Sequence, residues 1–76
     1  MHDAVNHPKH YTQGGIECID AIAAATINKQ GIEAACVANI IKYLWLYEAK
    51  NGVEDVNKAR WYIDRLIKEL GDGPTA

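Results

Sequence analysis

Residues 34–47, with the sequence AACVANIIKYLWLY, decide the fold of this 76-residue chain. Asn39 and Lys42 interrupt the apolar run, which is also shorter than the ~20 residues that a membrane span requires. The run predicts a helix over residues 32–50, ended by Asn51 and Gly52. A helix that is apolar on nearly every side is a buried helix. Two neighbouring helices in so short a chain cannot cover it completely, so we expect a homo-oligomer that assembles through this central helix.

Apolar residues at helical spacing predict two further helices on either side of the central one. The first covers residues 16–28, and the last covers residues 53–70 and ends at Gly71. Gly14 and Gly15 predict a flexible joint between the first helix and an extended arm that covers residues 1–15. The expected architecture is one all-α domain of three helices at residues 16–70, followed by a frayed tail at 71–76.

Composition excludes several classes of function. Eight basic residues against ten acidic ones argue against the basic stripe of a nucleic-acid-binding domain, so no DNA or RNA duplex is expected as a partner. A small anionic ligand needs only a few local cations and is compatible with this balance. Cys18 and Cys36 lie in apolar helical runs, which predicts buried thiols rather than a disulfide. No apolar signal-peptide core occurs in the polar first 15 residues, so we expect a cytoplasmic protein without membrane contact.

Several short motifs follow one another along the chain. The arm carries Val5-Asn6-His7-Pro8-Lys9-His10-Tyr11, and Gly14-Gly15-Ile16-Glu17 with Ile19-Asp20 comes next. The remaining motifs are Asn39 with Lys42-Tyr43-Leu44-Trp45, then Lys50-Asn51-Gly52, Glu54-Asp55 and Lys58-Ala59-Arg60-Trp61-Tyr62. In this order they resemble the SaV-like phage family, a short domain of unknown function, over roughly residues 5–67.

The resemblance implies a function that composition alone would not suggest. Some members of that family are described as nucleotide kinases that phosphorylate deoxynucleoside monophosphates without a P-loop, and these are longer and form large oligomers. Another member triggers a host abortive-infection system. The resemblance therefore implies phosphoryl transfer with ATP and Mg²⁺ in the cytoplasm of an infected host cell. Leu46 stands where the family often has an arginine, which is a departure at a position suited to holding phosphate.

The motif residues suggest where a nucleotide would bind. Histidines and a tyrosine beside a rigid proline, just before a helix start, can contact a phosphate and a base. Lys42 is an ammonium on an apolar helix and shares a face with Asn39. The expected nucleotide-binding residues are Asn6, His7, His10, Tyr11, Asn39, Lys42, Tyr43 and Trp61. The expected catalytic residues are Lys42, Asp20 and Glu17, where a carboxylate would position the metal.

Each of these residues also has a structural interpretation. The arm can simply pack across the domain, and Lys42 can pair with Asp20 or Asp55. Acidic residues such as Glu17, Asp20, Glu54 and Asp55 are favoured in the first turn of any helix. The spacing of His7 and His10 does not match a structural zinc site, and we expect no bound metal of that kind.

Two other functions remain open beside the kinase hypothesis. The first is a non-catalytic oligomer that sequesters a nucleotide signal used in host defence. The second is a protein–protein adaptor that acts on a host defence factor and binds no small ligand. The kinase is the preferred interpretation, and Leu46 in place of the expected arginine, together with the short chain, supports the sequestering protein as its alternative.

Overall fold

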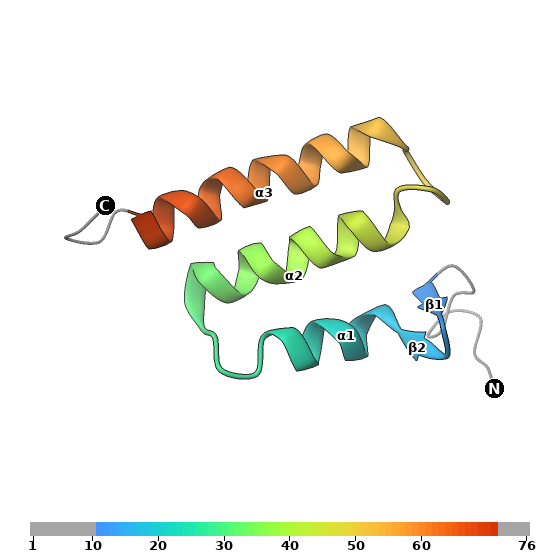
Figure 1. Cartoon of the computed structure of the whole chain (residues 1–76), viewed down its shortest axis with the longest axis horizontal. Coiled ribbons are helices and arrows are strands. Elements are labelled where there is room, and N and C mark those ends of the chain that lie inside the picture. The colour runs from blue at the N-terminus through green and yellow to red at the C-terminus, as the bar shows by residue number, and fades with distance from the viewer. Residues whose placement is uncertain (1–10, 72–76) are drawn as a thin grey trace.

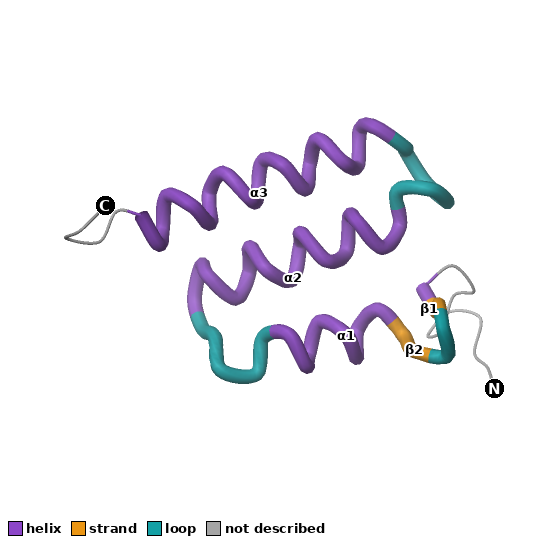
Figure 2. Tube along the Cα trace, viewed as in Figure 1, coloured by secondary structure: helices purple, strands orange, loops and turns teal. Residues whose placement is uncertain are grey.

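The computed structural model describes residues 11–71, which form three helices preceded by a small β-hairpin. The strands are β1 (Thr12–Gln13) and β2 (Ile16–Glu17), and the helices are α1 (Cys18–Ala25), α2 (Gly31–Leu46) and α3 (Val53–Gly71). Figures 1 and 2 show the helices side by side, with the hairpin at one end of α1. The predicted three helices are thus confirmed, and the two-stranded sheet is an element that the sequence analysis did not predict.

The hairpin corrects the predicted start of the first helix. Gly14 and Gly15 have φ angles of 59° and 78°, the signs required of a type I′ turn, and Thr12 pairs with Glu17 across it. Such turns join two antiparallel strands because their twist matches that of the strands. The two glycines therefore form a defined turn rather than a flexible joint, and α1 begins at Cys18 instead of residue 16.

Two hydrogen bonds fix the hairpin on the end of α2. The Gln13 Nε2 donates to the carbonyl oxygen of Trp45 at 2.8 Å, and the Trp45 Nε1 donates to the carbonyl oxygen of Tyr11 at 3.1 Å. The residues involved are more than 30 positions apart in the chain. The described end of the predicted arm, from Tyr11 onward, therefore packs on its own α2.

Two of the helices end earlier than predicted. The Thr26 amide and hydroxyl both donate to the carbonyl oxygen of Ile22, at 3.0 and 2.8 Å, and α1 stops at Ala25 rather than residue 28. The second helix stops at Leu46 rather than residue 50. The following turn closes when the amide of Gly52, at a φ of 56°, donates to the carbonyl oxygen of Tyr47 at 2.8 Å.

The helices form a single layer. In Figure 1, α2 lies between α1 and α3, and the shortest dimension of the molecule is 19 Å. Among residues 11–71, α1 and α3 each pack against α2 and have few contacts with each other. Among the described residues, the fully buried apolar side chains are Cys18, Cys36, Leu46 and Ala59. Both cysteines are free thiols, as predicted from their apolar surroundings.

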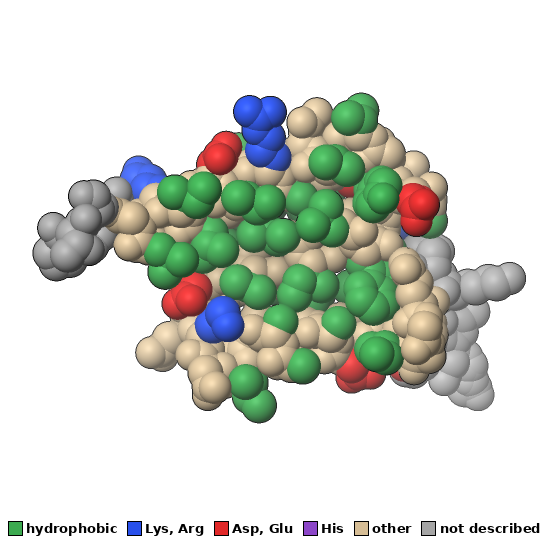
Figure 3. Space-filling model, in the orientation of Figure 1, with side chains coloured by type: hydrophobic (Ala, Val, Ile, Leu, Met, Phe, Trp, Pro, Cys, Tyr) green, Lys and Arg blue, Asp and Glu red, His purple; other side chains and the backbone are tan. Residues whose placement is uncertain are grey.

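One face of this layer is covered by hydrophobic side chains. Figure 3 shows them as a continuous field over the helices, with charged groups toward its margins. Aliphatic side chains of α3 expose 38–61% of their surface at helical spacing, and Leu44 of α2 exposes 45%. The exposed aliphatic residues of α3 that form this stripe are Val56, Ile63, Ile67 and Leu70. We call these residues together with Leu44 the apolar face.

Within residues 11–71, none of the helices is both long enough and apolar enough to cross a lipid bilayer. This finding agrees with the short, interrupted apolar run of the central helix.

The hairpin contact can be tested with two matched substitutions. Trp45→Phe removes the indole donor to Tyr11, and we expect it to lower the free energy of unfolding by about 1 kcal/mol. Trp61→Phe makes the same chemical change at a side chain that is 60% exposed. We expect it to change the free energy of unfolding by no more than about 0.5 kcal/mol. Urea denaturation at one fixed protein concentration measures both, and equal effects would contradict the proposed role of the Trp45 contact.

Candidate functional site

The turn between α2 and α3 is held by a buried carboxylate. Asp55 is 3% exposed, and its Oδ2 accepts a hydrogen bond from the backbone amide of Asn51 at 3.0 Å. Its Oδ1 accepts from the Asn51 side-chain amide at 3.4 Å. Asp55 is the third residue of α3, where a side chain can reach back to the free amides that precede a helix. The structural interpretation of this acidic residue is therefore confirmed.

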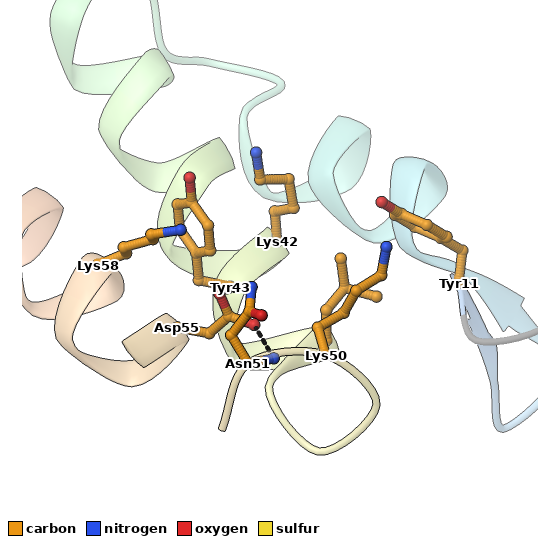
Figure 4. Close-up of a pocket in the computed structure, with 8 residues that line it drawn as sticks. Tyr11, Lys42, Tyr43, Lys50, Asn51, Asp55 and Lys58 are labelled. Atoms are coloured by element: carbon orange, nitrogen blue, oxygen red, sulfur yellow. Dashed lines mark hydrogen bonds between the residues drawn. The ribbon is translucent and has the colours of Figure 1, made fainter. Parts of the chain in front are cut away.

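Beside this turn lies a concavity of about 170 Å³, which we call the lysine pocket. Figure 4 shows how residues from α2, the turn, α3 and the segment before β1 surround it. Three of the eight basic residues of the chain line it, although the chain as a whole is net acidic. The lining residues are Tyr11, Lys42, Tyr43, Leu46, Lys50, Asn51, Asp55 and Lys58.

The lysine side chains lie near aromatic rings. The ammonium groups of Lys42 and Lys58 lie 4.5 and 5.6 Å from the centre of the Tyr43 ring, and that of Lys50 lies 5.9 Å from the centre of the Tyr11 ring. These distances fall within the range of cation–π interactions. Two cations beside one ring repel each other, so an anion placed between them would gain from both.

Local interactions set the charge of this pocket. The Lys58 ammonium donates a hydrogen bond to the Glu54 carboxylate, whose Oε2 lies 3.2 Å away, and this interaction raises the pKa of Lys58. Burial raises the pKa of the Cys18 thiol, and the nearby Lys42 ammonium partly opposes that rise. Lys42 forms no ion pair with Asp20 or Asp55 in the described part of the chain, so the pairing considered for it is not found. Three lysines and one carboxylate therefore line the pocket. That carboxylate accepts hydrogen bonds from Asn51, and Glu54, outside the lining, pairs with Lys58.

A second concavity, of about 310 Å³, adjoins the first along α3. Its lining consists of Tyr43, Lys58, Trp61 and Tyr62, and we call it the aromatic shelf. The Tyr43 and Tyr62 rings are stacked at 22° with centres 6.1 Å apart, while Trp61 meets Tyr62 at 79° with centres 4.9 Å apart. Tyr43 and Lys58 belong to both concavities, so they form the ridge between them.

The structure brings together half of the predicted nucleotide-binding residues. Tyr11, Lys42 and Tyr43 line the lysine pocket, and Trp61 lines the adjoining shelf. Asn39 lies one turn before Lys42, but its side-chain amide donates to the carbonyl oxygen of Ala35 at 2.9 Å, and it lines neither concavity. The predicted residues Asn6, His7 and His10 lie outside the described residues.

The two predicted catalytic carboxylates lie elsewhere. Glu17 is on β2 and Asp20 is in the first turn of α1, and neither lines the lysine pocket or the aromatic shelf. Across residues 11–71, no three His, Cys, Asp or Glu side chains gather in a way suited to a metal ion. The role expected for Glu17 and Asp20 in positioning Mg²⁺ stays a prediction.

Several lining residues were not predicted as nucleotide-binding. Lys50 and Asn51 were expected at a helix end, and Lys58 was not among the expected nucleotide-binding residues. The early end of α2 at Leu46 folds the turn back toward α3, which brings these side chains to one concavity. No helical periodicity signals this grouping, because Lys42, Lys50 and Lys58 lie on α2, on the turn and on α3, and the turn itself brings them together.

The role of Asp55 is testable by comparison with its neighbour. Asp55→Ala leaves the Asn51 amide without its acceptor, and we expect the free energy of unfolding to fall by about 1–2 kcal/mol. Glu54→Ala removes the same charge but breaks only an exposed ion pair, and its cost should be below about 1 kcal/mol. Thermal and urea unfolding measure both variants, and a larger loss for Glu54→Ala would be the contrary result.

Comparisons with known proteins place the chain in a family. No curated protein and no solved structure matches it. A family description does match residues 5–64, which is more than half of the chain and includes every described residue of the lysine pocket and the aromatic shelf. The chain therefore belongs to the family described as protein of unknown function DUF3310.

Proposed function

We propose that this protein binds a nucleotide in the lysine pocket and on the aromatic shelf. The observation that carries the proposal is the gathering of Lys42, Lys50 and Lys58 around one concavity, next to a second concavity lined by aromatic rings. Phosphate needs cations or amide donors, and a base needs a flat apolar surface. The pocket and the shelf supply these two requirements side by side.

Electrostatics favours a phosphorylated ligand over a neutral one. One pair of opposite unit charges 4 Å apart gains about 1 kcal/mol in bulk water and about 4 kcal/mol at an effective dielectric constant near 20. The pocket is open to solvent, so values toward the lower end apply. Three such pairs still favour a phosphate group over an uncharged group of similar size. A nucleoside without phosphate should therefore bind far more weakly than its monophosphate.

The extension from binding to catalysis rests on the sequence resemblance. The SaV-like motifs imply a nucleotide kinase that transfers a phosphoryl group from ATP to a deoxynucleoside monophosphate. Phosphoryl transfer depends mostly on positioning and on neutralising charge, and the lysines of the pocket suit that task. In this scheme Lys42 and Lys58 hold phosphate oxygens from the two sides of Tyr43. The scheme also needs Mg²⁺, which the ATP phosphates would carry into the site, because the expected carboxylates Glu17 and Asp20 line neither concavity.

The site can be tested by removing a single charge. We expect deoxynucleoside monophosphates or ATP to raise the melting temperature of the wild-type protein, because a ligand that binds the folded state stabilises it. Lys42→Ala should weaken binding at least about tenfold, as expected for a lost charge-assisted contact. Lys68→Ala is the matched control, since it removes a lysine from the last turn of α3, outside both concavities.

Isothermal titration calorimetry supplies the affinities for this comparison. Equal affinities of the two variants, or no binding of any nucleotide to the wild type, would contradict the proposed site. Turnover is measured separately, by following the conversion of ATP and a deoxynucleoside monophosphate to two diphosphates. Binding without turnover would favour the sequestering protein over the kinase.

We also propose that a second copy of the chain covers the apolar face. A domain normally packs two layers of secondary structure around its core, and this chain supplies one layer. The apolar face lies opposite the pocket. Ile67 is nine residues from Lys58, which places the two about 180° apart around α3, and Leu44 is about 160° from Lys42 around α2. Self-association through this face would leave the lysine pocket open to solvent in each copy.

Self-association predicts a specific effect of charge on the apolar face. Ile67 is 61% exposed, and Ile67→Glu should raise the dissociation constant of the oligomer at least about tenfold, because it buries a carboxylate without a partner. Lys68→Glu introduces the same group one position along α3 and should leave the assembly intact. Analytical ultracentrifugation distinguishes these outcomes, and a monomeric wild-type protein would refute the proposed assembly.

A further inference from the structure

We propose an orientation for the bound ligand, which rests on the proposed function. The phosphate groups of a nucleoside phosphate occupy the lysine pocket, its base lies against the aromatic shelf, and Trp61 forms the outer stacking surface. The ligand crosses the ridge formed by Tyr43 and Lys58. The ligand class is therefore a mononucleotide with at least one phosphate and an aromatic base.

The volumes of the two concavities indicate which end of the ligand each one holds. Pockets that hold a whole drug-sized ligand measure about 300–1,000 Å³. The lysine pocket, at about 170 Å³, is too small for a complete nucleotide but accommodates a phosphate or diphosphate group. The aromatic shelf, at about 310 Å³, has room for a base and its sugar. The distribution of charge supports the same assignment, because Lys42 and Lys50 line only the smaller concavity.

The geometry of the rings suits an inserted base. Trp61 and Tyr62 are nearly perpendicular, so they form a corner in which one ring faces the base and the other meets its edge. Tyr62 already stacks on Tyr43, which fixes it against α2. Trp61 is 60% exposed, and a large aromatic surface left open to water gains by stacking. Base stacking on such rings tolerates every base, so the shelf should discriminate weakly among them.

Lys58 lies between the lysine pocket and the aromatic shelf. Its ammonium lies 5.6 Å from the centre of the Tyr43 ring and borders both concavities. Its ammonium donates a hydrogen bond to Glu54, which raises its pKa and holds the side chain at the ridge. This charge lies where the phosphate nearest the sugar would cross from the lysine pocket to the shelf.

The test uses the tryptophan fluorescence of the wild-type protein, compared with Trp61→Leu, in which Trp45 is the remaining tryptophan and should not respond to nucleotide. We expect deoxynucleoside monophosphates and ATP to quench this fluorescence. Pyrophosphate should compete with them for the lysine pocket without quenching. Trp61→Leu, which keeps an apolar side chain, should weaken nucleotide binding by about 5- to 100-fold, the range that loss of base stacking predicts. Trp61→Tyr should restore most of the affinity, and pyrophosphate should bind both variants like the wild type.

The outcomes separate the orientation from the binding site itself. If Lys42→Ala abolishes nucleotide binding but Trp61→Leu leaves it unchanged, the orientation is overturned and the site stands. Quenching by pyrophosphate equal to that by nucleotides would also overturn the orientation. If neither nucleotides nor pyrophosphate bind the wild-type protein, the proposed function fails and this inference fails with it.

Discussion

The packing of α2 between α1 and α3 is the constraint on which the other features depend. Both flanks of α2 are occupied by helices, and its two remaining sides are left to solvent or to a ligand. One of these sides carries Lys42 and the buried Leu46, and the turn after the helix adds Lys50 to it. The other side continues into the aliphatic stripe of α3. A single layer of helices thus produces two surfaces with different chemistry, one cationic and aromatic and the other apolar.

Repulsion among the lysines of the pocket lowers the stability of the fold, which is a reason to expect that the pocket binds an anion. Three lysines placed around one concavity repel each other, and the chain has two more acidic than basic residues with which to relieve that repulsion. The carboxylate within the pocket, Asp55, accepts hydrogen bonds from Asn51 at the start of α3. Cation–π contacts with Tyr43 and Tyr11, and the ion pair of Lys58 with Glu54, offset part of the repulsion. A bound anion would offset the rest, which is the physical reason to regard this surface as a binding site.

Much of this arrangement follows from residue patterns. The three helices were predictable because their apolar residues recur at helical spacing, and the buried thiols followed from their apolar neighbours. The hairpin was missed because two glycines permit either a joint or a tight turn, and the pairing of Thr12 with Glu17 decides between them. The end of α2 was placed too late because the break comes at Leu46, in a sequence with high helix propensity, and tertiary packing overrides such propensity. Lys42, Tyr43 and Trp61 were identified as ligand candidates, whereas Lys50 reaches the pocket only through the turn that α2 forms by ending early.

The most direct test of the central claim is an NMR titration of the ¹⁵N-labelled protein with a deoxynucleoside monophosphate. The account predicts that backbone amide signals of Lys42, Tyr43, Asn51 and Lys58 shift together with the indole signal of Trp61. Signals of Ile67 and Leu70, on the apolar face, should remain in place. Shifts confined to the apolar face, or no shifts at millimolar nucleotide, would contradict the claim that the lysine pocket and the aromatic shelf bind nucleotides.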